Sequence, residues 1–369
     1  MSETDYKLKI RNLRKTYGSL VALDDASIDL GAGEFLTLLG PSGSGKTTML
    51  MAVAGLNDPD SGEVWIDGKL ATYLPAFQRD IGMVFQNYAL FPHMTIFENI
   101  AFPLRMRKLD RAAIRAGVQR VLDIVQLPDV ADRLPSQLSG GQQQRIALAR
   151  CFVYEPSIIL MDEPLGALDK KLRDQLQLEI KHLHQQLGVT MLYVTHDQEE
   201  AMVMSDRICL MNDARIEQIG TPDDLYFRPV SLFAADFLGE SNLVEAEVAA
   251  RDGKGTLLTR GESKIRAIAD GGLEPGQRVK FMVRPECVEI LDAVGGDDGR
   301  HDNVVTATLK EVIMTGHVTK YFLALADGTA MLSTQLTRGS IREVALGRTV
   351  RLAWPQDRTV ALKAEVTGP

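Results

Sequence analysis

Residues 40–48 read GPSGSGKTT, in which three glycines are interspersed with proline and serine ahead of one lysine and two threonines. An apolar run at 35–40 precedes this stretch and a helical run follows it, which is the context of a phosphate-binding loop. Glycines let backbone amides wrap around an anion, and the start of a helix adds a partial positive charge. The stretch therefore predicts a nucleoside triphosphate site made of Gly40, Pro41, Ser42, Gly43, Ser44, Gly45, Lys46, Thr47 and Thr48.

Two adjacent carboxylates end a second apolar run, IILMDEP at 158–164. A buried strand would deliver both acids at its carboxyl end, the edge where open α/β sheets bind ligands. There Lys46 would neutralise the β- and γ-phosphates, while Thr47 and Asp162 would hold Mg²⁺. Glu163 would orient and polarise a water molecule for attack on the γ-phosphate. The alternative is a solvated acidic pair at the end of a strand.

Two further polar residues close apolar runs that are predicted as strands. His196 ends TMLYVTH at 190–196 and could meet the γ-phosphate, although a lone histidine is more often structural. Gln86 closes IGMVFQ at 81–86 and could contact Mg²⁺ and the attacking water, although an isolated glutamine is a weak signal. Beside the loop and the acids, both are predicted as catalytic.

The sequence LSGGQ, comprising Leu138, Ser139, Gly140, Gly141 and Gln142, starts a helical run with no lysine beside it. The ordered series of loop, Gln86, LSGGQ, acids, GALD (166–169) and His196 resembles the ATP-binding cassette (ABC) ATPases over residues 7 to about 238. The resemblance implies that LSGGQ closes over ATP held by a second cassette. A serine cap and a helix start facing that anion are physically reasonable.

The same resemblance implies two further contacts. Tyr17 would stack on the adenine, although from the sequence alone it is more simply a surface or core aromatic. Asp169 would contact the opposite phosphate loop across a dimer.

The elements that must position these residues alternate along the chain up to about residue 238. Short apolar runs, most without the alternation of a half-solvated strand, alternate with helical patterns at 110–127 and 171–187. They predict a mainly parallel sheet, and the resemblance adds an antiparallel β-subdomain and a helical subdomain at about 87–155. We expect an ABC nucleotide-binding domain at 1–238. Residues 239–369 show only short β-type runs and predict a small all-β, OB-like (TOBE-type) domain.

Bulk properties exclude several classes. The chain has 369 residues, 45% hydrophobic and 24% charged, and a formal net charge of −8, which argues against a nucleic-acid partner. Its three scattered cysteines are typical of a reduced cytosolic protein. The polar amino terminus shows no signal peptide, and no apolar run is long enough to span a membrane. Another chain would have to supply any membrane crossing.

Two further segments resemble those of the importers within the ABC family. NYALFPHMTIFENIAFPLRMRK at 87–108 looks like the segment that receives a membrane subunit's coupling helix, and FMVRPECVEI at 281–290 looks like the importers' regulatory β-domain. The implied protein is the ATPase of a bacterial importer at the cytoplasmic face of the inner membrane. Its implied partners are a second copy or a paralogue, two permease subunits and an external binding protein.

The junction DFLGESNLVEAEV at 236–248 resembles the polyamine (spermidine/putrescine) branch. The alternatives are an importer for an aminophosphonate, ferric iron or a maltose-type sugar, and a non-transport ABC ATPase that acts on DNA or ribosomes.

Overall fold

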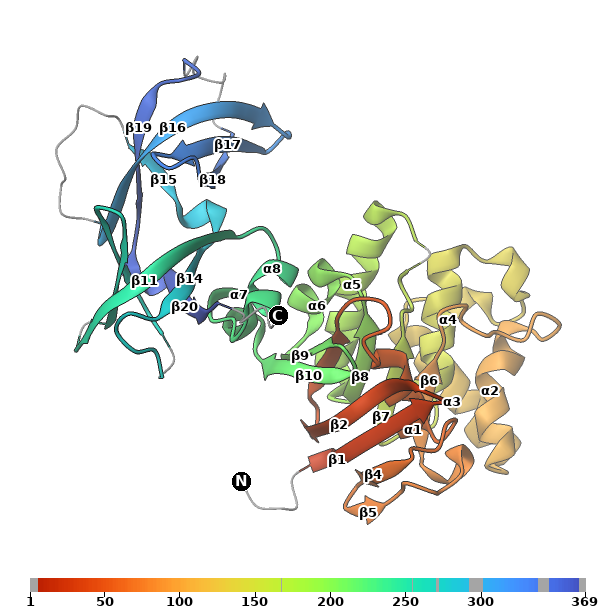
Figure 1. Cartoon of the computed structure of the whole chain (residues 1–369). Helices are drawn as coiled ribbons and strands as arrows, with labels where there is room; N and C mark the ends of the chain where they lie inside the picture. Colours follow the sequence, from red (N-terminus) through yellow and green to blue (C-terminus); the bar gives the residue numbers. More distant parts are fainter. Residues whose placement is uncertain are drawn as a thin grey trace. The chain divides into compact units, whose positions relative to one another are not determined.

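The structure is a computed structural model that describes residues 6–166, 168–253, 255–269, 272–291, 301–337 and 345–364. The chain divides into two compact units, Met1–Pro222 and Asp223–Pro369, and each is described by itself. Figure 1 follows the chain from red at the N-terminus to blue at the C-terminus. The phosphate loop, the acids and LSGGQ all belong to the first unit. The domain boundary expected at 238/239 stays a prediction.

A six-stranded sheet in the order β10-β9-β3-β8-β7-β6 forms the centre of the first unit. Its strands are β3 (Phe35–Leu39), β6 (Ile81–Val84), β7 (Ile158–Asp162), β8 (Thr190–Thr195), β9 (Arg207–Asn212) and β10 (Arg215–Gly220). All neighbours pair in parallel except the hairpin β9–β10. Every residue of β3 and β8 is buried, as expected for strands covered on both faces. The carboxyl ends of β3, β8 and β7 consequently meet at one edge.

A second sheet, antiparallel and in the order β2-β1-β4-β5, shares a core with one face of the central sheet. Its strands are β1 (Tyr6–Tyr17), β2 (Leu20–Gly31), β4 (Ser61–Ile66) and β5 (Lys69–Leu70). Leu36 and Leu38 of β3 join that core together with α1 (Lys46–Ala54). The expected antiparallel subdomain is therefore present. Its long strands carry several register shifts, which blur the alternation that would reveal them in the sequence.

Phe35, on the other face of β3, lies in a core built mainly from helices. These are α2 (Ile96–Met106), α3 (Arg111–Ile124), α4 (Gly140–Phe152), α5 (Lys170–Leu187) and α6 (Gln198–Met204). Figure 1 shows α2, α3 and α4 grouped together, in orange to yellow, as the expected helical subdomain. The helices predicted at 110–127 and 171–187 are confirmed as α3 and α5. Among the described residues, no helix is both long and apolar enough to cross a membrane.

The second unit begins with two short helices, α7 (Pro222–Phe227) and α8 (Leu232–Phe237). Two five-stranded antiparallel sheets follow, in the orders β13-β12-β11-β14-β20 and β15-β19-β16-β17-β18. Their strands are β11 (Asn242–Asp252), β12 (Gly255–Arg260), β13 (Ser263–Ala267), β14 (Arg278–Val283), β15 (Glu289–Leu291), β16 (Asn303–Met314), β17 (Val318–Leu325), β18 (Ala330–Leu336), β19 (Thr349–Trp354) and β20 (Thr359–Lys363). The stacked rings of Phe281 and Trp354 lie in one core shared by both sheets. The expected all-β domain is confirmed.

The described residues also include short 3₁₀ helices. They are η1 (Ala76–Gln78), η2 (Pro128–Val130), η3 (Pro135–Gln137), η4 (Pro285–Cys287) and η5 (Gln356–Arg358).

Candidate active site

The phosphate loop runs from the end of β3 to the start of α1, where the strand–loop–helix context predicted it. β3 ends at Leu39, one residue earlier than predicted, because Gly40 leaves the extended conformation with φ +157 and lies close to another backbone. A Cβ at Gly40 would lie 2.2 Å from the carbonyl oxygen of Met211, and one at Gly45 would lie 2.5 Å from that of Ala22. Both positions therefore require glycine.

The side chain of Lys46 folds back over this loop. Its Nζ donates hydrogen bonds to the carbonyl oxygens of Gly40 (2.9 Å) and Pro41 (2.8 Å), and the residue is only 5% exposed. Burial lowers the pKa of Lys46, while the nearby charges of Glu163 and Asp162 oppose that shift. The lysine is therefore held inside the loop by these two hydrogen bonds.

Asp162, the last residue of β7, meets the loop at Thr47. The Thr47 hydroxyl donates a hydrogen bond to Asp162 Oδ1 at 3.3 Å. Burial is the largest influence on Asp162 and raises the pKa of its carboxyl group, with a smaller contribution from the neighbouring Glu163 charge. A hydroxyl and a carboxylate are oxygen ligands of the kind that Mg²⁺ prefers, so this pair fits the ion.

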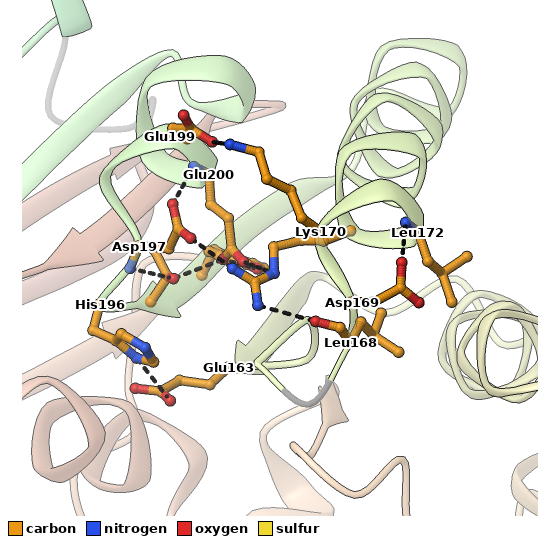
Figure 2. A network of polar contacts seen from close by, with 12 residues as sticks. Glu163, Leu168, Asp169, Lys170, Leu172, His196, Asp197, Glu199 and Glu200 are labelled. Carbon is orange, nitrogen blue, oxygen red and sulfur yellow. Dashed lines mark hydrogen bonds and ion pairs between the residues drawn. The ribbon is translucent and has the colours of Figure 1, made fainter. Parts of the chain in front are cut away.

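Glu163 and His196 follow adjacent strands and face each other, as Figure 2 shows. His196 Nδ1 lies 3.1 Å from Glu163 Oε2. Glu163 adopts φ +44, a conformation rare for residues other than glycine, and its amide donates to the carbonyl oxygen of Val194 at 3.0 Å. Strand β8 ends at Thr195 rather than at the predicted His196, which leaves the histidine in the following turn with a side chain 58% exposed.

Gln86 lies beside this pair. Strand β6 ends at Val84, so Gln86 falls in the loop after the strand rather than within it. The position that a Cβ of Gly166 would take is 3.6 Å from Gln86 Nε2 and 3.9 Å from Glu163 Oε2. The two side chains therefore border the same small space, although they come from different loops.

The LSGGQ segment opens α4 through a reciprocal cap. Ser139 Oγ accepts a hydrogen bond from the Gln142 amide (3.4 Å), and Gln142 Oε1 accepts one from the Ser139 amide (3.0 Å). The predicted serine cap is confirmed. Ser139 and Gly140 are exposed, whereas a Cβ at Gly141 would lie 3.3 Å from the Leu172 side chain. The cap and this packing thus fix the start of the helix, while Ser139 and Gly140 remain exposed.

The two residues implied only by the resemblance are both accessible. Tyr17 ends β1 with half of its surface exposed, and its hydroxyl accepts a hydrogen bond from Asn57. Asp169 caps α5, since its Oδ1 accepts a hydrogen bond from the Leu172 amide at 3.1 Å. Their proposed contacts with adenine and with a second chain stay predictions.

The structure contains a polar network next to His196 that the sequence analysis did not predict. It joins Arg173, Tyr193, Thr195, Asp197 and Glu200. The spacing of Asp197 and Glu200 is typical of a helix start and could have predicted that cap. Nothing in the sequence points to Arg173, because its acidic partners, Asp197 and Glu200, lie on another segment of the chain.

The two halves of the chain match different known families. Residues 23–166 match the ABC transporter family, and residues 281–362 match the TOBE domain.

Curated relatives cover nearly the whole chain. The spermidine/putrescine import ATP-binding protein PotA of Rubrobacter xylanophilus is 43% identical, over 94% of this chain and 91% of its own. The protein of the same name from Haemophilus influenzae (strain Rd) is 48% identical, over 81% of this chain and 80% of its own.

Solved cassettes resemble the first unit. CbiO1 of Clostridium perfringens, part of an ABC transporter complex, is 28% identical with a TM-score of 0.57 and covers 60% of this chain and 90% of its own. The cassette MJ0796, solved as a dimer in a post-hydrolysis state with ADP and Pi, is 35% identical with a TM-score of 0.52. It covers 58% of this chain and 98% of its own.

Proposed function

The chain belongs to the ABC transporter family, among the ATP-binding import proteins with a TOBE domain, and on that premise we propose that it hydrolyses ATP to drive polyamine uptake. The observation that carries this proposal is the pair formed by Glu163 and His196, at 3.1 Å, on the sheet edge that also carries Lys46 and Asp162. The full-length relatives named for spermidine and putrescine import support the choice of solute.

The residues at this edge have separate tasks in the proposed reaction. The loop amides and Lys46 bind the β- and γ-phosphates, and Tyr17 stacks on the adenine. Thr47, Asp162 and Gln86 hold Mg²⁺, which supplies charge neutralisation for the phosphates when bound. Glu163 orients a water molecule in line with the γ-phosphate and polarises it by accepting a hydrogen bond from it. His196 contacts a γ-phosphate oxygen.

We propose that a second copy, or a paralogue, completes each site. Ser139, Gly140, Gly141 and Gln142 of one chain would face the ATP bound to the loop of the other, and Asp169 would approach that loop as well. The exposed start of α4 supports this arrangement, because the dipole at the amino end of a helix favours an anion. The dimeric state of a similar cassette supports it too.

The remaining partners follow from the import role. Two permease subunits would receive the ATPase at the cytoplasmic face of the membrane, and an external binding protein would deliver the solute. Residues 1–238 would form the nucleotide-binding domain and residues 239–369 the regulatory domain.

The solute is tested in the importer reconstituted with its permease subunits. The binding protein is loaded in turn with spermidine, putrescine, an aminophosphonate, maltose and ferric iron, and ATP hydrolysis is measured. We expect a polyamine to stimulate hydrolysis. Stimulation by another solute alone would overturn the choice of polyamine and retain the ATPase.

A further inference from the structure

Arg173 joins two chain segments that border the site. Its guanidinium donates one hydrogen bond to Asp197 Oδ2 (2.9 Å) and another to the carbonyl oxygen of Leu168 (3.1 Å). Leu168 precedes α5, and Asp197 directly follows His196, so one planar group fixes the spacing between the two turns. Figure 2 shows Leu168, His196 and Asp197 around these contacts.

Asp197 also fixes the backbone of the turn that contains His196. Its amide donates to Thr195 Oγ1 (3.0 Å), and its Oδ1 accepts a hydrogen bond from the Glu200 amide (3.2 Å). The carboxylate therefore caps α6 with one oxygen and binds Arg173 with the other. Since His196 lies between Thr195 and Asp197, its backbone is held on both sides.

Glu200 anchors the same network in the protein interior. The residue is 2% exposed, and its Oε2 accepts hydrogen bonds from the hydroxyls of Tyr193 (2.7 Å) and Thr195 (2.6 Å). Its other oxygen lies 3.9 Å from Arg173 Nε. Arg173 Nε has no hydrogen-bond partner among the described residues, so the buried carboxylate adds only a longer ion-pair contact to the two hydrogen bonds that hold Arg173.

The other end of the link reaches the LSGGQ segment. A Cβ at Gly140 would lie 3.7 Å from the Leu168 side chain, so Leu168 packs against the start of α4. Arg173 thus lies between the segment proposed to face the partner's ATP and the histidine proposed to face the chain's own ATP.

We propose that Arg173 is a positioning residue for ATP hydrolysis, which keeps His196 aligned with Glu163 and ties that alignment to the segment ahead of α5. This inference rests on the proposed function. Arg173 touches neither the phosphate loop nor Tyr17 in the contacts described, so its loss lowers kcat and leaves the KM for ATP nearly unchanged. Small displacements of a catalytic group cost up to about 100-fold in rate, which sets the expected scale.

The test compares Arg173→Met with Lys170→Met in the full-length protein. Lys170 pairs with Glu199 at 3.3 Å and so also connects the starts of α5 and α6, but both side chains are largely exposed. We expect Arg173→Met to lower kcat by about 10- to 100-fold with KM changed less than about threefold. Lys170→Met should stay within about twofold of wild type, as exposed pairs contribute little. Arg173→Lys should recover only part of the loss, because lysine lacks the planar fork.

A double-mutant cycle of Arg173 and His196 distinguishes a positioning role from a general contribution to the stability of the fold. In a His196→Ala background, Arg173→Met should reduce kcat little further, because the group that it positions is gone. Asp197→Asn serves if Arg173→Met folds poorly, since asparagine keeps the helix cap and loses the carboxylate. It should lower kcat with a fall in Tm too small to unfold the protein at the assay temperature.

Wild-type kcat in both Arg173→Met and Asp197→Asn would overturn the inference, as would an equal loss with and without His196. Failure of the proposed function looks different: the wild-type protein would then show no ATP hydrolysis. If only the proposed catalytic roles fail, His196→Ala and Glu163→Gln would keep full ATPase activity.

Discussion

His196 Nδ1 lies 3.1 Å from Glu163 Oε2, although the two residues follow different strands, β8 and β7. The contact exists because these strands are parallel neighbours that end at the same edge, with Asp162 paired to Val194 in the register. With Nδ1 directed at the carboxylate, Nε2 is the ring nitrogen left for the proposed contact with a phosphate oxygen. In the proposed reaction, the pair would combine a group for the water with a group for the γ-phosphate.

Glu163→Gln should bind ATP and hydrolyse it slowly. Removing the charge that orients water should lower kcat by about 100-fold or more, while the loop and Lys46 remain intact. Steady-state hydrolysis and size-exclusion chromatography with ATP measure both properties, and an ATP-stabilised dimer is expected. Glu199→Gln, an exposed glutamate on α6, is the matched control. Turnover close to wild type would remove Glu163 from its role.

Ser139 variants should separate helix capping from nucleotide recognition. Ser139→Asp retains an N-cap side chain of similar quality but adds a negative charge where the partner's phosphate is proposed to bind. We expect an unchanged Tm and an ATPase rate at least about tenfold lower. Ser139→Ala should instead lower the Tm by about 2–4 °C, through the loss of roughly 1 kcal/mol of capping. A fully active Ser139→Asp would contradict the proposed trans contact.

Cysteine pairs test the proposed trans contact directly. One chain carries Ser139→Cys and the other Ser42→Cys, both at exposed positions. Cys287 is replaced by serine, while Cys151 and Cys209 stay because burial raises their pKa to about 11 and about 12. We expect a crosslink between chains that requires ATP. With both cysteines on one chain, crosslinks formed only within that chain would exclude the arrangement.

Asp162 should destabilise the nucleotide-free protein at neutral pH. Burial raises its pKa in the folded state, so the folded protein disfavours the charge that the unfolded chain carries freely. The penalty is complete above the folded pKa and vanishes below the unfolded value of about 3.9. Asp162→Asn should therefore raise the Tm at pH 7 by a few degrees, with no gain near pH 3, and should abolish hydrolysis.

Asp24 provides a control of opposite sign. The hydrogen bond from Arg215 is the largest influence on Asp24 and lowers its pKa. Its stabilising contribution is present above the unfolded pKa and is lost as the pH falls through the folded value. Asp24→Asn should lower the Tm at pH 7, and the difference from wild type should shrink as the pH falls below the unfolded value of about 3.9. Equal shifts for both variants would show that the effect does not arise from the local pKa values.

Much of the fold and most of the site are predictable from local patterns. The glycines around Lys46 and the apolar run before Asp162 identify both a structure and its chemistry, because strand, loop and helix are contiguous in the sequence. The LSGGQ cap is predictable for the same reason, since Ser139 and Gln142 are three positions apart. Each of these signals depends only on near neighbours.

What the sequence leaves open depends on contacts between distant segments. Arg173 pairs with Asp197 across two elements, and its own neighbourhood on α5 is an ordinary polar helix surface. The exact ends of β6 and β8 also differ from the prediction, because backbone pairing stops at Val84 and at Thr195, before the polar residues Gln86 and His196. Tertiary pairing decides such boundaries, and residue type does not.

The glycines of the phosphate loop predict an uneven tolerance to substitution. A side chain at Gly40 or Gly45 would collide with a backbone oxygen, whereas a Cβ at Gly43 would meet nothing within 4 Å. Among protein contacts, only the conformation, φ +83, restricts Gly43, and asparagine or aspartate can adopt positive φ. The fold itself therefore tolerates a change at Gly43 but none at Gly40 or Gly45, and any intolerance at Gly43 would report on the nucleotide rather than on folding. A saturation library scored for both folding and ATP binding would separate the two requirements.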